Sequence, residues 1–234
     1  MSDDNSWVGL GGWDEVASGL RQFMAYAIAN VAFTVLVLVA TIAIAAGGGY
    51  ESLATLFSLA KVAAVVGVLI AIFGLVAVWR IAQIHPLTGA RGVAQAAFWL
   101  GIISLAISIV SIIGLMGSRD LEAVSANNLW DLLAKLMGAI QFFCLVGAMR
   151  ITAGYIGRLD LHQLAGTTMV LAGVTVALVV FSQIMAATQV LALTALLGLG
   201  VIGIGIWCFV YLLILVVRLA RAVTGDAQLP STFS

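Results

Sequence analysis

The residue types that most often carry chemistry are sparse in this sequence. The two histidines, His85 and His162, lie in predicted loops, whereas haem ligation within a bundle needs histidines that face each other from the helices. The two cysteines, Cys144 and Cys208, lie in the middle of apolar stretches and are interpreted as small packing residues. No zinc-site spacing, Ser-His-Asp set, HExxH motif or catalytic carboxylate pair can be assembled. We therefore expect no catalytic residue, no metal site, no cofactor and no enzymatic activity.

One stretch, Gly198-Leu-Gly200-Val-Ile-Gly203, has the glycine spacing of a dinucleotide-binding motif. That motif binds nucleotides only between a strand and a helix, with a carboxylate about 20 residues further on. Here it lies within an apolar segment, so we reject the nucleotide interpretation. Glycines spaced by seven residues instead indicate helix faces that pack closely in lipid. These predicted packing residues are Gly67 and Gly74, Gly147 and Gly154, and Gly198 and Gly205.

The elements that carry these residues are predicted to span a membrane. Hydrophobic residues make up 63% of the 234 positions and charged residues 9%, which a water-soluble fold could not accommodate. Lys plus Arg and Asp plus Glu number 10 each, so no net charge attracts nucleic acid. A span needs about 20 apolar residues. The six predicted spans are 24–46, 57–84, 93–117, 129–156, 164–187 and 190–217.

The predicted architecture is an all-α integral membrane protein. Its parts are an N-terminal leader or interfacial segment (1–23), a six-helix transmembrane domain (24–221) and a short C-terminal tail (222–234). Pro86 ends the second span, and the break between the last two spans is placed at Ala186–Gln189. Residues 1–15 contain no Lys or Arg, so they do not resemble a secretory signal, and the first span is expected to be retained.

The distribution of basic residues predicts the orientation. One side of the membrane collects seven Lys/Arg residues (Arg21, Arg80, Arg91, Arg150, Arg158, Arg218 and Arg221), and the other collects three (Lys61, Arg119 and Lys135). Basic loops stay in the cytoplasm. Both termini belong to the more basic side, so both are predicted to be cytoplasmic.

Self-comparison indicates three repeated helical hairpins. Leu75–Ala82, Leu145–Thr152 and Leu213–Ala220 each carry an arginine within an apolar stretch, namely Arg80, Arg150 and Arg218. These arginines are interpreted as interfacial anchors at the ends of the even-numbered spans. Arginine commonly ends a cytoplasmic helix terminus without any duplication, so that simpler explanation stays open.

Ionisable residues inside a membrane usually indicate transport, and none lies at mid-depth in the predicted spans. Gln141 and Gln183 are the deeper polar residues. They are interpreted as donors and acceptors of interhelical hydrogen bonds, and a polar pathway is the alternative.

The stretch Leu129–Arg158 (LWDLLAKLMGAIQFFCLVGAMRITAGYIGR) and the tail after Phe209 resemble the small polytopic membrane proteins of type IVB secretion and I-type conjugation systems. That resemblance implies a subunit of a transfer apparatus in a bacterial inner membrane.

Two functions are therefore considered. The first is a non-enzymatic subunit of a larger membrane assembly, with lipid, other membrane protein subunits or further copies of itself as partners. The second is a small-solute channel or transporter built from three hairpins. An aqueous path lined by Gln and Ser would favour the transporter, and apolar surfaces on every helix would favour the subunit.

Overall fold

The chain folds into an all-helical bundle. The computed structural model describes residues 13–47, 50–117, 128–187 and 191–224. Six long helices and one 3-10 turn follow each other: α1 (Trp13–Ala46), α2 (Tyr50–Ile81), η1 (Pro86–Thr88), α3 (Arg91–Gly117), α5 (Asn128–Tyr155), α6 (Leu159–Ala187) and α7 (Leu191–Val223). The described residues include no strand. All six long helices are long and apolar enough to cross a membrane, which confirms the predicted fold class.

The helix boundaries follow local chemistry. α2 ends at Ile81, shortly before Pro86, which begins the turn η1. The turn closes at Gly89, where a φ of 70° favours glycine. Gly157 has a φ of 74° and ends α5 in the same way. The last break lies between Ala187 and Leu191, close to its predicted place, whereas α1 starts at Trp13, well before the predicted span.

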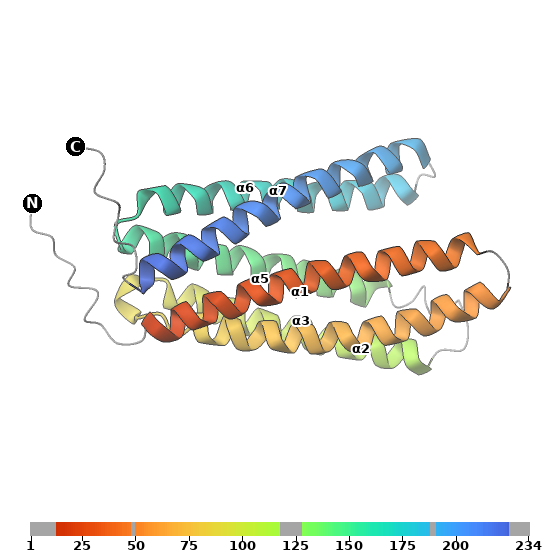
Figure 1. The fold of residues 1–234 in the computed structure, drawn as a ribbon, viewed down its shortest axis with the longest axis horizontal. Helices are drawn as coiled ribbons and strands as arrows, with labels where there is room; N and C mark the ends of the chain where they lie inside the picture. The colour runs from red at the N-terminus through yellow and green to blue at the C-terminus, as the bar shows by residue number, and fades with distance from the viewer. Residues whose placement is uncertain (1–12, 48–49, 118–127, 188–190, 225–234) are drawn as a thin grey trace, which may run out of the picture.

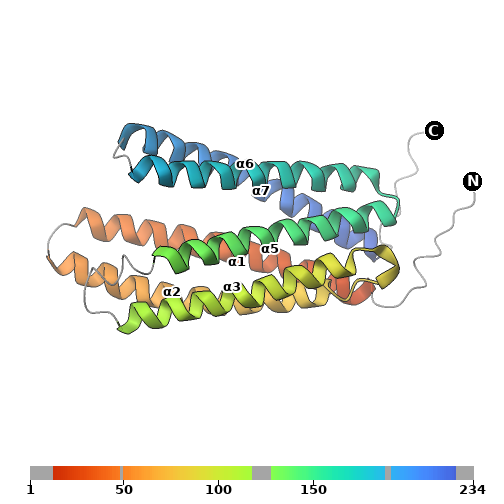
Figure 2. The same cartoon turned by 180° about the vertical axis from the view of Figure 1, so that it is seen from behind.

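The helices are arranged as a ring in chain order. Each helix packs against the next one, and α7 packs against α1 to close the ring, as Figures 1 and 2 show from opposite sides. The most extensive contacts are between α1 and α2, between α3 and α5, and between α6 and α7. This pairing is compatible with three hairpins, and their origin by duplication stays a prediction.

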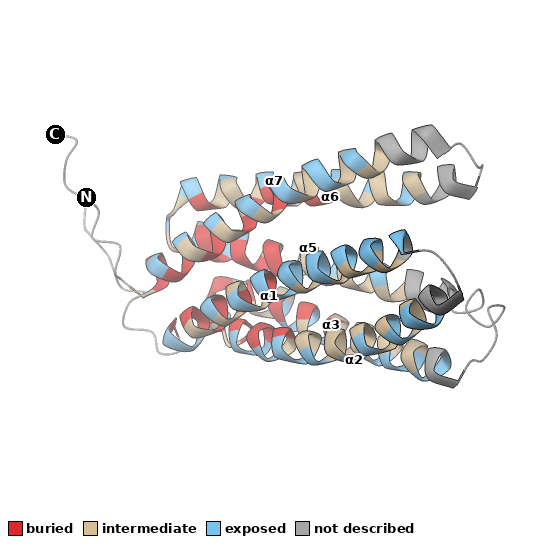
Figure 3. Ribbon diagram, turned by 45° about the vertical axis from the view of Figure 1, so that its right-hand side comes forward, coloured by how far each residue is buried: buried red, intermediate tan, exposed pale blue. Residues whose placement is uncertain are grey.

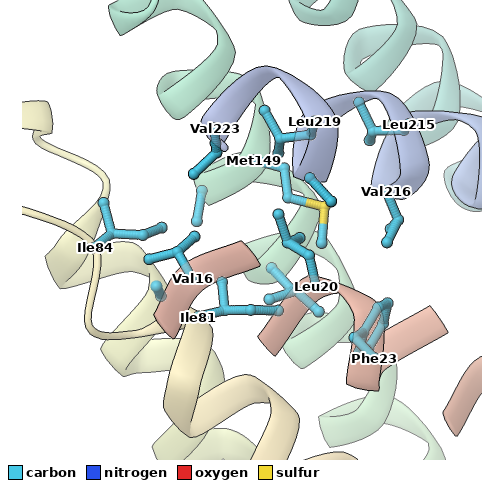
Figure 4. Packing of buried hydrophobic residues seen from close by; sticks show 14 of the residues in the cluster. Val16, Leu20, Phe23, Ile81, Ile84, Met149, Leu215, Val216, Leu219 and Val223 are labelled. Carbon is cyan, nitrogen blue, oxygen red and sulfur yellow. The ribbon is translucent and has the colours of Figure 1, made fainter. Parts of the chain in front are cut away.

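The closely packed core lies at one end of the ring. Its buried side chains come from the start of α1, the ends of α2, α5 and α7, and the starts of α3 and α6 (Figure 3). Figure 4 shows Leu20 of α1 beside Met149 of α5, with Leu219 of α7 on the other side of Met149. Toward the opposite end, the α6–α7 hairpin diverges from the other helices (Figure 1). We refer to these regions as the packed end and the open end.

Large apolar side chains are exposed on the outside of every long helix. Examples, one from each helix in order, are Leu36, Leu69, Trp99, Ile140, Val170 and Leu199. In water such surfaces would drive aggregation, but lipid tails solvate them as well as a protein core does. The burial pattern therefore fits an integral membrane protein.

Candidate functional site

A cavity at mid-height lies between α1, α2, α3 and α5. Its volume is about 220 Å³. Polar side chains that line it are Tyr26, Ser104, Ser108 and Gln141, and the packed-end residue Leu145 also borders it. Polar groups inside a membrane protein usually face other helices or a cavity rather than lipid. This cavity therefore brings together polar side chains from three helices, α1, α3 and α5.

Two glycines make the space in which the large cavity residues sit. A Cβ on Gly74 would lie 2.7 Å from the ring of Tyr26. A Cβ on Gly101 would overlap the amide nitrogen of Gln141. Both glycines therefore hold α2 and α3 against side chains of neighbouring helices, which any larger residue would displace.

The serine hydroxyls that line the cavity donate hydrogen bonds within the protein and can still accept others. The Ser104 hydroxyl donates to the carbonyl of Ala134 across the α3–α5 contact at 3.1 Å, and Ser108 donates to the carbonyl of Ser104 at 2.9 Å. Each hydroxyl oxygen keeps its lone pairs as acceptors. Gln141 lies beside them and brings two N–H donors and one carbonyl acceptor. The site can therefore hydrogen-bond a small molecule or ordered water.

A second cavity, of about 330 Å³, adjoins the first and lies nearer the open end. The two share Ala71, Leu105 and Ser108, and Ser111 adds a further hydroxyl to the second. Ser104, Ser108 and Ser111 are spaced by four and three residues, so they follow one face of α3. No Asp, Glu, Lys, Arg or His is among the described residues that line either cavity. The chemistry suits an uncharged ligand.

The three predicted anchor arginines are all exposed near the packed end, and two of them have clear partners. Arg80 donates to the hydroxyl of Ser18 at 2.9 Å. Arg150 Nε donates to His162 Nε2 at 3.2 Å, and His162 Nδ1 lies 3.1 Å from the Arg150 carbonyl oxygen. Because a guanidinium can only donate, Nε2 accepts and Nδ1 carries the proton. Arg218 is also exposed, on the last turns of α7.

The six predicted packing glycines differ in what surrounds them. Gly74 meets Tyr26 closely, a Cβ on Gly154 would lie 3.4 Å from His162, and one on Gly147 would make an ordinary contact with Val93 at 3.9 Å. A Cβ on any of the other three would have nothing within 4 Å. These three are Gly67, Gly198 and Gly205. Their role in packing against another chain stays a prediction.

The remaining predicted residues lie apart from the cavities. His85 caps η1, where its Nδ1 accepts from the Leu87 amide at 3.4 Å. Cys208 is buried, with its sulfur 3.8 Å from the Thr168 carbonyl oxygen. The described residues contain no group of three His, Cys, Asp or Glu side chains that could hold a metal. Gln183 lies in α6, and its side chain is outside the described residues.

The loop from α5 to α6 carries an exposed ion pair. Arg158 Nε and Nη2 each lie 3.0 Å from a carboxylate oxygen of Asp160. This hydrogen bonding raises the pKa of the Arg158 guanidinium above its ordinary value. The pair links the short loop to the first turn of α6 and contacts neither cavity.

Comparison with known proteins gives no relative: no family model matches the chain, and neither a curated protein nor a solved structure does.

Proposed function

We propose that this chain is a non-enzymatic membrane subunit that works by packing against other membrane-spanning helices in a larger assembly. The main support for the proposal is an apolar groove. It lies where the α6–α7 hairpin begins to separate from helices α1 and α5. A cavity of about 300 Å³ marks it, and Val31, Phe142, Cys208 and Phe209 are among its lining residues.

The glycines of α7 support this interpretation. Gly205 lines the groove, and a Cβ on Gly198, Gly203 or Gly205 would meet nothing within 4 Å. Within lipid, helices associate through close van der Waals packing, and glycine allows two backbones to approach. In this chain α7 carries such glycines at positions where an added Cβ has no described atom within 4 Å. A transmembrane helix with small residues at its interface would fit there.

Enlarging the α7 glycines tests the proposal. Gly198→Leu and Gly205→Leu add bulk to the surface that a partner helix would contact, and an added Cβ at either position has no described atom within 4 Å. The matched control is Gly92→Leu on α3, which is exposed, lies at the packed end and also has nothing within 4 Å of an added Cβ. Solubilised native membranes are run on native gels, and the mass of the complex that contains each variant is measured.

We expect the wild type and the Gly92→Leu variant to migrate in a complex larger than the monomer. The two α7 variants should insert into the membrane in equal amounts but migrate as the monomer. A wild-type chain that is monomeric in native membranes would contradict the proposal, and so would an unchanged complex in both α7 variants.

The partners that we propose belong to a type IVB secretion or conjugation apparatus in a bacterial inner membrane. The support is the sequence resemblance of Leu129–Arg158 described above. Co-isolation of the complex with its partners, identified by mass spectrometry, tests this narrower proposal separately from the packing of α7.

A second function, passage of a small uncharged solute, is favoured by the two adjoining cavities. Gln141 and Ser108 line them, and no charged side chain does so among the described residues. Purified protein in liposomes would then show saturable flux, which Gln141→Leu abolishes and Ile140→Ala, on the exposed face of the same helix, preserves. Such flux from the purified chain alone would replace the subunit proposal.

A further inference from the structure

A separate polar pocket lies at the packed end, away from both cavities and from the α7 groove. It is formed by the first turns of α1 and the last turn of α2, and its volume is about 470 Å³. Its lining comprises Asp14, Glu15, Ser18, Trp79, Arg80 and Gln83. Two carboxylates and one guanidinium thus share one pocket.

The opposite charges in this pocket are separated. The only hydrogen bond from the Arg80 side chain among the described residues goes to Ser18, at 2.9 Å, and no ion pair joins Arg80 to Asp14 or Glu15. The carboxylates of Asp14 and Glu15 interact favourably with the positive N-terminal end of the α1 dipole. Both side chains are exposed, so their oxygens can also accept hydrogen bonds from a ligand. A pocket with separated positive and negative groups matches a ligand that carries both charges.

The framework of the pocket is rigid. Gly19 brings α1 onto α2 so closely that an added Cβ would lie 2.8 Å from Arg80 Cβ and 2.9 Å from the Ile81 backbone nitrogen. Val16 and Val78, next to the pocket residues in sequence, are buried in the core. The charged groups therefore project from the best-packed part of the bundle, which holds their separation fixed.

The pocket lies where lipid headgroups are found. α1 has 34 residues, and about 50 Å of helix exceeds the roughly 30 Å of hydrocarbon, so its ends extend into the headgroup layer. The uncharged part of α1 begins after Arg21, which places the first turns outside the hydrocarbon. Trp79 is 51% exposed and packs on Phe98 with ring centroids 5.0 Å apart. Tryptophan at a span end is typical of the membrane interface.

The order of charges along α1 and α2 matches one class of lipid. Arg80 and Ser18 lie nearer the middle of the bundle, and Asp14 and Glu15 lie one turn further out. In a phospholipid with an amine headgroup, the phosphate lies deeper and the ammonium group lies further toward water. We propose that this pocket binds the headgroup of phosphatidylethanolamine, with the phosphate on Arg80 and the ammonium group at Asp14 and Glu15.

Phosphatidylethanolamine fits better than other common lipids. Its ammonium group donates hydrogen bonds to carboxylates, and charge-assisted bonds of this kind are among the stronger ones. Phosphatidylcholine has no N–H group to donate, and phosphatidylglycerol brings no positive charge to the two carboxylates. The pocket therefore distinguishes headgroups by charge and by hydrogen bonding rather than by shape alone.

Native mass spectrometry of the purified full chain tests the proposal. Phosphatidylethanolamine, phosphatidylcholine and phosphatidylglycerol with identical acyl chains are offered at equal concentrations, and the fraction of protein with each lipid bound is measured. The variants are Arg80→Gln, the double change Asp14→Asn with Glu15→Gln, and the control Arg21→Gln. Arg21 is exposed on the same helix but is not among the residues that line the pocket. Circular dichroism establishes that each variant remains helical.

We expect the wild type and Arg21→Gln to prefer phosphatidylethanolamine about tenfold, as one charge-assisted hydrogen bond would give. Arg80→Gln should lose binding of this lipid, and the double variant should lose the preference over phosphatidylglycerol. Equal binding of all three lipids by the wild type would overturn the proposal, as would an equal loss in Arg21→Gln and Arg80→Gln. Equal occupancy by soluble phosphoethanolamine at the same concentration would overturn the assignment to a lipid.

Discussion

The contact of α1 with α2 at Gly19 allows a direct test of how closely the helices pack at the packed end. In Gly19→Ala the new Cβ would lie 2.8 Å from Arg80 Cβ, 2.9 Å from the Ile81 nitrogen and 3.0 Å from the Ala77 carbonyl oxygen. Two of these atoms are backbone, so no rotamer change relieves the overlap. The helices must separate by about 0.7 Å to reach normal carbon–carbon contact.

Overpacking of this kind costs about 1–3 kcal/mol. Alanine has a better helix propensity than glycine, which raises the free energy of unfolding by about 0.5–1 kcal/mol. We therefore expect the free energy of unfolding of Gly19→Ala to fall by up to about 2.5 kcal/mol, and to lie about 1–3 kcal/mol below that of a glycine-to-alanine change without overlap. Gly67→Ala on α2 is the matched control, because nothing lies within 4 Å of its added Cβ. It should be neutral or slightly stabilising.

Reversible unfolding in mixed micelles, followed by circular dichroism, measures both variants against the wild type. If Gly19→Ala is as stable as Gly67→Ala, α1 and α2 do not approach as closely as described, and the argument for a rigid packed end fails.

Three further predictions concern the polar cavity, the buried core and the loop between α5 and α6. In a background without the native cysteines, Ser108→Cys should react with a small hydrophilic thiol reagent, whereas Val110→Cys on the lipid face should not; equal reactivity would contradict a polar cavity. Leu20→Ala should lower the free energy of unfolding by about 2–5 kcal/mol because Leu20 is fully buried, and Leu36→Ala, at an exposed position, should change it little. Unfolding in micelles measures both, and similar losses would contradict the burial pattern. Asp160→Asn breaks an exposed ion pair and should cost at most about 1 kcal/mol in the same assay; a larger loss would show that the loop supports the fold.

Much of the architecture is visible in the sequence because lipid imposes a simple rule on it. A membrane span must satisfy its backbone within one helix and must be apolar over its length. Charged loops and Pro86 therefore mark most helix ends to within a few residues. The exceptions are the starts of α1, α2 and α6 and the end of α7, and the start of α1 departs furthest from its predicted place. The glycines before and after Trp13 suggest an irregular leader, but Trp13, Val16 and Leu20 bury themselves in the core and extend the helix.

Tertiary packing is less visible, because a glycine looks the same in the sequence whether its neighbour is a helix, lipid or a cavity. The seven-residue spacing singles out Gly67 and Gly74 alike, yet only Gly74 meets a side chain, that of Tyr26. Gly19 makes the closest approach to backbone atoms and is not one of the six predicted packing glycines. The neighbour of each glycine depends on how the helices are rotated about their axes, which composition does not set.

The candidate sites could be predicted only in part, because each joins residues from different helices. The depth of Gln141 could be predicted from its position in the fourth span, but its neighbours Ser104 and Ser108 come from another helix. The pocket at Arg80 joins the first turns of α1 with the end of α2, which lie about 60 residues apart in the chain, as the separation of 62 between Ser18 and Arg80 illustrates. Local patterns could not bring these residues together.

We predict that the six spans place the packed end and both termini in the cytoplasm, and thiol labelling of intact cells tests this orientation most directly. In a background without Cys144 and Cys208, one cysteine replaces Ser118 in the segment between α3 and α5, and another replaces Leu87, which is 69% exposed in the turn between α2 and α3. We expect a membrane-impermeant reagent to label the Ser118 site in intact cells and to label the Leu87 site only after the cells are opened. Labelling of the Leu87 site in intact cells, or of both sites alike, would contradict it.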